Sequence, residues 1–303
     1  MEANQLEKAL ELYNGEYVDG KFAYKLMKVP TVSKMEQRIK YFIIEWAYNN
    51  KIHTEYDNFG NLYLTKGKIE DNEYYPCVTA HLDTVQIRHI PFIQNNNELD
   101  VKIKRAHGKT KFYHPNYGLG GDDKCGILIC LSLLEKIDKL KVAFFVQEEV
   151  GTVGSQRLNT KWFDNVGYVI GYDSPDRNRA AYACKGNRLF SQDFFENHIK
   201  EVCEKNGVTN FYSEPNTDVR VIREKVDVQC MNFGSGYYKA HTKDEYILLE
   251  DVDAACKLGY ELINHLGLSK YYFKRHTAHL SNIRYACQKL YRKFKRRLKN
   301  TFK

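Results

Sequence analysis

The segment 142-VAFFVQEEVG-151 decides the fold of this chain. Its first five residues are all apolar and rich in valine and phenylalanine, which is typical of a strand buried on both faces of a sheet. Two adjacent acids, Glu148 and Glu149, follow this strand. Because neighbouring carboxylates at the end of a buried strand repel each other unless cations neutralise them, the pair indicates a cation site.

Two other short apolar segments also end at a polar residue. Residues 77–80 (CVTA) precede His81, and residues 166–170 (VGYVI) lie just before Asp173. Strands of this kind alternate with helical segments, which predicts a three-layer α/β fold with a mostly parallel central sheet and helices on both faces. Since ligand sites in open α/β sheets gather at the carboxyl ends of strands, we expect these three patches to meet.

Helices are predicted where apolar residues recur at steps of three and four. Ser33 and Glu36 form a capping-box pattern ahead of a helix that ends near Asn49. The polar segments 94–97 and 107–116 are expected to form loops near the site. The other expected elements are a turn at 57–61, strands at 62–64 and 230–233, a loop at 118–121, and helices at 125–137, 188–206 and 250–266.

The composition is typical of a globular protein without a membrane span. The chain has 303 residues, of which 43% are hydrophobic and 28% charged, enough for one large domain or two small ones. No apolar run approaches the roughly 18 residues of a membrane helix, and the polar residues 1–13 do not fit a signal peptide. Eight cysteines are scattered without a CxxC pair, which favours reduced thiols and a cytoplasmic protein over a cysteine zinc site.

Basic residues are concentrated at the C-terminal end. The net charge is +8, yet residues 270–303 hold twelve Lys and Arg and no acid, which leaves residues 1–269 with a net charge of −4. We therefore expect a catalytic domain over 1–269 and a basic tail over 270–303. Helical spacing of apolar residues from Leu280 to Leu298 predicts a basic amphipathic helix. This helix would dock on the body, remain solvated, or contact an anionic membrane surface or nucleic acid.

Two of the polar patches have structural explanations when each is taken alone. A histidine after a strand is more often structural, but Asp83 lies two residues beyond His81 on the same face of an extended segment and can hold its imidazole in the ligating tautomer. In the segment 118-GLGGDDKCG-126, Asp123 can cap the helix that follows, because carboxylates favour helix N-termini. Asp122 would then be free to bind metal.

The last two patches gain meaning only as members of a set. Asp173 alone fits a turn, and His241 in KAHTKDEY is unremarkable alone. Together the patches offer two imidazoles and three carboxylates, which suit a pair of zinc ions. Glu148, beside a ligand, is left to act as a general base. The metal-ligand candidates are His81, Asp122, Glu149, Asp173 and His241.

The order of the motifs resembles that of the di-zinc exopeptidases and amidohydrolases related to peptidase T, aminoacylase and glutamate carboxypeptidase. The motifs are HLDTV at 81–85, GLGGDDKCG at 118–126, EEVGTVGS at 148–155, the single Asp173, and HTKDEY at 241–246. The DDKCG segment at 122–126 is most similar to the peptidase T branch, as are VPTVS at 29–33 and DNFGNL at 57–62. The resemblance covers roughly residues 5 to 266.

This resemblance implies how the ligands divide between two zinc ions. Asp122 would bridge both ions. His81 and Asp173 would complete one site, and Glu149 and His241 would complete the other. Zinc is expected from the mixed imidazole and carboxylate donors, and Co²⁺ or Mn²⁺ could replace it.

The resemblance also implies the chemistry. A zinc-bridged water would have a lowered pKa, Glu148 would accept its proton and return it to the leaving amine, and Asp83 would orient His81. The expected activity is hydrolysis of peptide bonds in small peptides, by an aminopeptidase or a di- or tripeptidase. Hydrolysis of N-acyl amino acids or other amides at the same site is the close alternative. A non-catalytic binding protein on this fold is the alternative from another class.

One departure from the family lies between Asp173 and His241. Peptidase T-like enzymes insert a lid or dimerisation domain between these two ligands, whereas here they are only 68 positions apart. We therefore expect a zinc-peptidase-like fold without that domain, similar to compact single-domain zinc aminopeptidases. The turn at 216–218 (NTD) resembles a segment of the compact relatives. Side-chain preference, the terminus recognised and the oligomeric state stay open.

Overall fold

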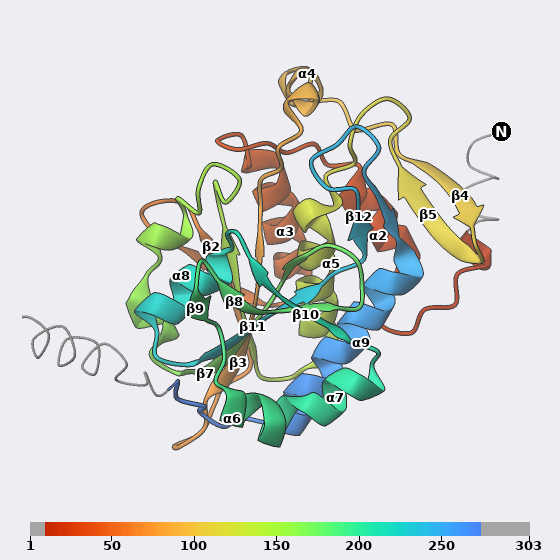
Figure 1. Ribbon diagram of the computed structural model, residues 1–303. Helices are drawn as coiled ribbons and strands as arrows, with labels where there is room; N and C mark the ends of the chain where they lie inside the picture. The colour runs from red at the N-terminus through yellow and green to blue at the C-terminus, as the bar shows by residue number, and fades with distance from the viewer. Residues whose placement is uncertain (1–9, 274–303) are drawn as a thin grey trace, which may run out of the picture. The chain divides into compact units, whose positions relative to one another are not determined.

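A nine-stranded sheet forms the centre of the computed structural model, which describes residues 10–273 (Figure 1). Its strands are β1 (His53–Tyr56), β2 (Leu62–Lys66), β3 (Tyr75–His81), β6 (Leu140–Phe145), β7 (Val166–Ser174), β8 (Arg179–Cys184), β9 (Asn187–Arg188), β10 (Asn210–Glu214) and β11 (Gln229–Gly234). Their order is β1-β2-β6-β3-β7-β11-β8-β10, with β9 paired to β8. The four central strands β6, β3, β7 and β11 are parallel, which confirms the predicted mostly parallel sheet.

The central strands are buried because their sequences are nearly continuous apolar runs. Every residue of β3 and of β6 is buried. Polar side chains in these two strands form hydrogen bonds inside the protein. Thr79 donates to the carbonyl of Ala143 at 2.7 Å, and Lys141 donates to the carbonyl of Trp162 at 2.6 Å. Strands of this type require cover on both faces, and helices supply it.

Helices lie on both faces of the sheet, so the predicted three layers are confirmed (Figure 1). On one face α5 (Gly121–Lys136) packs against β3 and β7, and α9 (Leu249–Leu266) packs against α5; on the other face α8 (Asp218–Lys225) packs against β11. The remaining helices are α2 (Gly20–Met27), α3 (Gln37–Asn49), α4 (Ile90–Gln94), α6 (Gln192–Phe194) and α7 (Lys200–Lys205), with short 3-10 turns at Ile87–His89, Ser155–Arg157 and Thr160–Phe163.

A second, four-stranded sheet corrects the loop predicted at 107–116. The strands β4 (Lys102–Ala106) and β5 (Lys109–Tyr113) form a hairpin that continues through β13 (Tyr246–Leu248) to β12 (Tyr237–Tyr238). His107 and Gly108 both have positive φ, as a two-residue hairpin turn requires. Every second residue of β5 is buried, and this two-residue period outweighs its polar composition.

Two helix predictions were also wrong in detail. The helix expected over 188–206 is divided into β9, α6, a π-helical turn at Phe195–Ile199 and α7. Ser191 caps the N-terminus of α6, because its hydroxyl accepts the backbone N–H of Phe194. Ser33 does not cap α3 either: its hydroxyl donates to Asp83 Oδ2 at 2.6 Å, and α3 begins only at Gln37.

The segment between Asp173 and His241 belongs to the fold itself. It supplies β8 to β12 and the helices α6 to α8, and within this described segment there is no inserted lid domain. The chain divides into units 1–272 and 273–303, and the basic helix expected between residues 280 and 298 lies outside the described residues. Within residues 10–273, no helix has both the length and the apolar character that a membrane crossing requires.

Candidate metal centre

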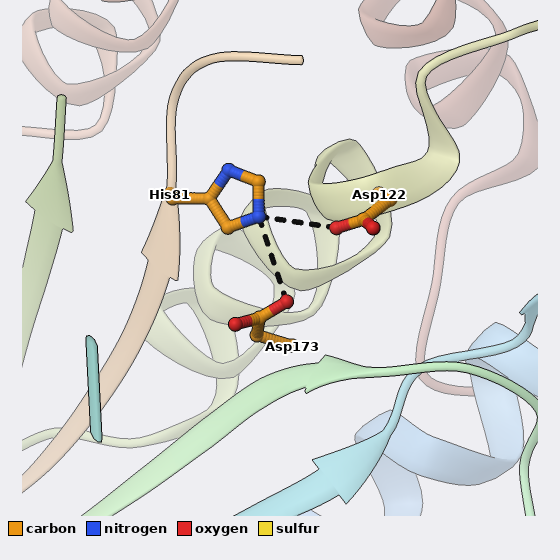
Figure 2. Close-up of side chains that lie close together, drawn as sticks. All are labelled: His81, Asp122 and Asp173. Carbon is orange, nitrogen blue, oxygen red and sulfur yellow. Dashed lines mark hydrogen bonds and ion pairs between the residues drawn. The ribbon is translucent and has the colours of Figure 1, made fainter. Parts of the chain in front are cut away.

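Three of the predicted ligands meet at the carboxyl ends of the central strands. His81 ends β3, Asp173 lies near the end of β7, and Asp122 lies in the first turn of α5. His81 Nε2 is 3.1 Å from Asp122 Oδ1 and 3.5 Å from Asp173 Oδ1. Figure 2 shows both carboxylates on the same side of the His81 ring. These side chains could hold one metal ion, since one ligand atom from each lies within 4.8 Å of the others.

A second group of ligands shares Asp122 with the first. His241 Nε2 lies 3.1 Å from Asp122 Oδ2 and 3.2 Å from Glu149 Oε1. The two oxygens of Asp122 therefore face two different histidines, His81 through Oδ1 and His241 through Oδ2. The His241 side chain is 54% exposed while those of Asp122 and Glu149 are below 10%, so the second group lies at the mouth of the site.

The electrostatics of this centre favour positive charge at both imidazole positions. The neighbouring carboxylates of Asp122 and Glu149 raise the pKa of His241 to about 10. Burial lowers the pKa of His81, but its carboxylate partners outweigh burial and hold that pKa well above the usual value. Burial also raises the pKa of Asp173 well above its usual range. Bound cations would also be stabilised by these carboxylates.

Glu149 provides an independent test of whether a metal ion fits. Its Oε1 atom is buried and makes no hydrogen bond within residues 10–273, although it lies 3.2 Å from His241 Nε2. A buried carboxylate oxygen without a hydrogen bond is costly unless a cation satisfies it. Together with imidazole nitrogens and carboxylate oxygens as donors, this fits zinc.

The orientation of His81 is set by neighbouring backbone and side-chain groups. Its Nδ1 lies 2.9 Å from the backbone carbonyl of Asp83 and 3.6 Å from Asp83 Oδ1, so the carbonyl is the nearer partner. Donation from Nδ1 leaves Nε2 free for a metal ion. Asp123 Oδ2 accepts the backbone N–H of His81 at 3.1 Å, and its Oδ1 accepts that of Gly126 inside α5.

Asp83 uses its carboxylate mainly to hold the segment with the two adjacent acids. The carboxylate accepts the backbone N–H of Glu148 at 2.9 Å and that of Glu149 at 3.3 Å. The hydroxyl of Ser33 donates to it as well. Asp83 thereby connects the end of β3 to the residues that follow β6.

Glu148 is a buried carboxylate beside the candidate metal ligands. Its side chain is buried, and burial raises its pKa to about 8. The amide of Asn216 donates a hydrogen bond of 3.1 Å to Glu148 Oε1, which fixes the orientation of the carboxylate. Groups with a pKa near the working pH are effective in proton transfer.

Glu245 was missed by sequence reasoning, although it belongs to the quoted HTKDEY segment. This buried carboxylate accepts the backbone N–H of Gly120 at 2.7 Å and that of Asp122 at 3.0 Å. It therefore fixes the turn that carries the shared ligand. Its proximity to His241 in the sequence was the available signal, but its partners lie more than 120 positions away.

The centre opens into a cavity of about 490 Å³. A volume of this order is typical of sites that bind small molecules. The lining residues are Asp122, Glu148, Glu149, Asp173, Pro175, Arg179, Tyr212, Glu214, Pro215, Asn216, Tyr237, Ala240 and His241.

Comparison with known proteins gives one family. Residues 61–264 match the family model described as peptidase family M28. Over 181 residues the chain is 24% identical to the cytosol non-specific dipeptidase of Escherichia coli. That match covers 56% of this chain but only 36% of the length of the dipeptidase.

Solved structures of similar fold include two peptidases. Aminopeptidase PepT from Bacillus cereus is 17% identical with a TM-score of 0.66, over 84% of this chain and 99% of that one. A tripeptidase from Staphylococcus aureus is 14% identical with a TM-score of 0.62, over 82% of this chain and 98% of that one. These similarities confirm the predicted zinc-peptidase-like fold class.

Proposed function

The chain belongs to peptidase family M28, and from that premise we propose that it hydrolyses peptide bonds of small peptides at a two-zinc centre. The observation that supports this proposal is the position of Asp122, whose two oxygens each lie 3.1 Å from a different histidine. A carboxylate placed between two ligand groups suits a bridging ligand better than two separate ion pairs. The match spans only 36% of the dipeptidase. The proposed activity therefore rests on the site of this chain and not on the activity of that relative.

The proposed ligands follow from the two groups. His81, Asp122 and Asp173 would hold one zinc ion, and Asp122, Glu149 and His241 the other. Bound in this way, the zinc ions would lower the pKa of a water molecule and polarise the scissile carbonyl. Co²⁺ or Mn²⁺ would suit the same donors.

The protein's own groups would move the proton. The Glu148 carboxylate would accept a proton from the attacking water and deliver it to the nitrogen of the leaving amine. Its hydrogen bond from Asn216 keeps one oxygen occupied, so the other is the one that would carry the proton. Asp83 would keep Glu148 in place through the backbone N–H of that residue.

We also propose a cytoplasmic location and a catalytic domain over 1–269. The seven cysteines among the described residues are free and buried, which suits a reducing compartment. Contact of the basic tail, 270–303, with an anionic surface stays a prediction.

The experiment combines metal content with turnover. Purified protein reconstituted with zinc should contain about two ions per chain and release amino acids from dipeptides. Glu148→Gln should keep both ions and lose at least about 100-fold in kcat, the lower range for general-base catalysis. Glu55→Gln, a change of an exposed glutamate on β1, is the matched control and should behave as the unmodified protein. A zinc-loaded protein without peptidase activity would overturn the proposal.

A further inference from the structure

We propose that Arg179 binds a carboxylate of the substrate, so that the site selects peptides that present a carboxylate to this side chain. The inference rests on the proposed peptidase function and adds a substrate class to it. Two parts of a small peptide could supply the group: the C-terminal carboxylate of a di- or tripeptide, or an acidic side chain.

Arg179 lies in the same cavity as the metal centre. It begins β8, six positions after Asp173, and lines the cavity together with Asp122 and Glu148. Among the described residues that line this cavity, it is the only lysine or arginine, whereas five are acids. Since zinc ions would neutralise the ligand carboxylates, Arg179 remains as the cavity's permanent protein cation for an anionic part of the substrate.

The guanidinium group is already held in position. Its Nε lies 2.7 Å from Asp176 Oδ2, and its Cζ lies 5.4 Å from the centre of the Tyr212 ring. Asp176 is itself fixed, because its backbone N–H donates to the carbonyl of Tyr237 and its carbonyl accepts from Gly236. A side chain fixed on two sides loses little conformational entropy when a ligand binds.

The two terminal nitrogens of Arg179, Nη1 and Nη2, are available to donate hydrogen bonds to a ligand. Neither Nη1 nor Nη2 makes a hydrogen bond to any residue in the part of the chain that the structure describes, 10–273, and the side chain is 34% exposed. Two parallel N–H donors of this kind match the two oxygens of a carboxylate. Nε faces Asp176 in an ion pair without hydrogen-bond geometry, so the Nη edge is left for the substrate.

A purely structural role for Arg179 predicts something different. If the side chain only fixed the loop at 175–178 through Asp176, substitution would impair charged and neutral substrates alike. If it binds a substrate carboxylate, substitution would impair the charged substrate selectively. The ratio of kcat/KM between matched substrates therefore separates the two roles.

The test uses two substrate pairs with the zinc-loaded full chain. Leu-Ala against Leu-Ala amide tests the C-terminal carboxylate, and Glu-Ala amide against Gln-Ala amide tests the acidic side chain. In one pair we expect the charged member to be preferred by about 10- to 100-fold in kcat/KM, the range for a hydrogen-bonded charge pair. The pair that shows the preference identifies the source of the carboxylate.

The variants are chosen to remove the cation without leaving a repelling charge. Arg179→Gln alone would leave the neighbouring Asp176 carboxylate without its ion-pair partner. The double variant Asp176→Asn/Arg179→Gln is therefore the main test, and its preference should fall to near one. Arg179→Lys keeps the charge without the fork and should keep part of the preference. Arg188→Gln, on β9 and outside this cavity, is the control and should retain the full preference.

A binding measurement keeps this inference separate from the proposed function. Calorimetry on zinc-loaded Glu148→Gln protein measures the binding of the same four peptides without turnover, with and without the Asp176→Asn/Arg179→Gln change. If the zinc-loaded unmodified protein hydrolyses none of the peptides but the Glu148→Gln protein binds the charged peptides more tightly, the peptidase proposal is overturned and the role of Arg179 is supported. Equal kcat/KM and equal affinity within both pairs, or a preference that survives the double variant, would overturn the role of Arg179 while the peptidase stands.

Discussion

The backbone N–H of Glu148 donates a 2.9 Å hydrogen bond to the carboxylate of Asp83. This bond joins two neighbouring strands at their carboxyl ends, because Asp83 follows β3 and Glu148 follows β6. The carbonyl of Asp83 also accepts from the Nδ1 edge of His81, at 2.9 Å. One residue thus positions a candidate metal ligand through its backbone and the candidate base through its side chain.

Asp83→Asn is expected to weaken zinc binding by about 10- to 100-fold, as is typical for groups that orient metal ligands. The amide keeps the shape of the side chain but offers only one acceptor oxygen and no charge to the N–H groups of Glu148 and Glu149. Competition with a chelator of known affinity measures the effect. Ser33→Ala is the matched control, since it removes only the hydroxyl donor and should have a smaller effect. An unchanged zinc affinity in Asp83→Asn would show that the backbone carbonyl alone suffices.

Glu245→Ala is expected to lower the free energy of unfolding by about 2–4 kcal/mol, because it leaves two buried N–H groups without an acceptor. Those groups belong to Gly120 and Asp122. Urea denaturation of the zinc-free protein measures the loss without any contribution from metal binding. The neighbouring Asp244 is exposed, so Asp244→Ala should stay within about 0.5 kcal/mol. Equal stability of the two variants would contradict the role of Glu245.

The strands β3, β6 and β7, which lead to the metal centre, could be predicted because a short apolar run bounded by polar residues is typical of a buried strand. The segments before His81, Glu148 and Asp173 are buried on both faces, so a short apolar run followed by a polar residue marked each strand end. The hairpin β4–β5 was missed for the opposite reason. Only one face of β5 is buried, and lysines on the other face made the segment resemble a loop.

Residues that act through distant contacts could not be found in the same way. Glu245 has no periodic pattern around it that predicts its partners Gly120 and Asp122. The helix over 188–206 failed for a related reason, since Ser191 caps a new helix in the middle of the apolar pattern. In each case the deciding hydrogen bond or ion pair depends on the tertiary fold or on a local competitor for backbone groups.

His89→Gln is expected to make the protein less sensitive to acid. Burial, followed by the nearby charge of Lys124, lowers the pKa of His89 to about 3, against 6.5 for an ordinary histidine. The unfolded state therefore binds more protons between these values, and stability falls as the pH drops from 6.5 toward 3, by at most about 1.4 kcal/mol per pH unit.

Glutamine can still donate to the carbonyl of Gly118, which His89 Nε2 contacts at 2.9 Å, but it does not titrate. The difference in unfolding free energy between wild type and His89→Gln, measured by urea denaturation at pH 7 and pH 5, should shift in favour of the variant by about 2 kcal/mol. His53→Gln is the matched control, because His53 is exposed and its replacement should leave the pH dependence unchanged. Parallel stability curves for wild type and His89→Gln would exclude His89 as an acid-sensitive group.

The sharing of Asp122 predicts a specific pattern of metal content. Asp173→Ala removes a ligand from one group only, and Glu149→Ala removes one from the other, so each variant should retain about one tightly bound zinc ion per chain. Asp122→Ala removes a ligand from both groups and should retain none. Elemental analysis after dialysis at a fixed zinc concentration gives the three values, with circular dichroism to confirm that each variant is folded. If Asp122→Ala lost only one ion while folded, its two oxygens would serve one site, and the bridging role proposed for it would be wrong.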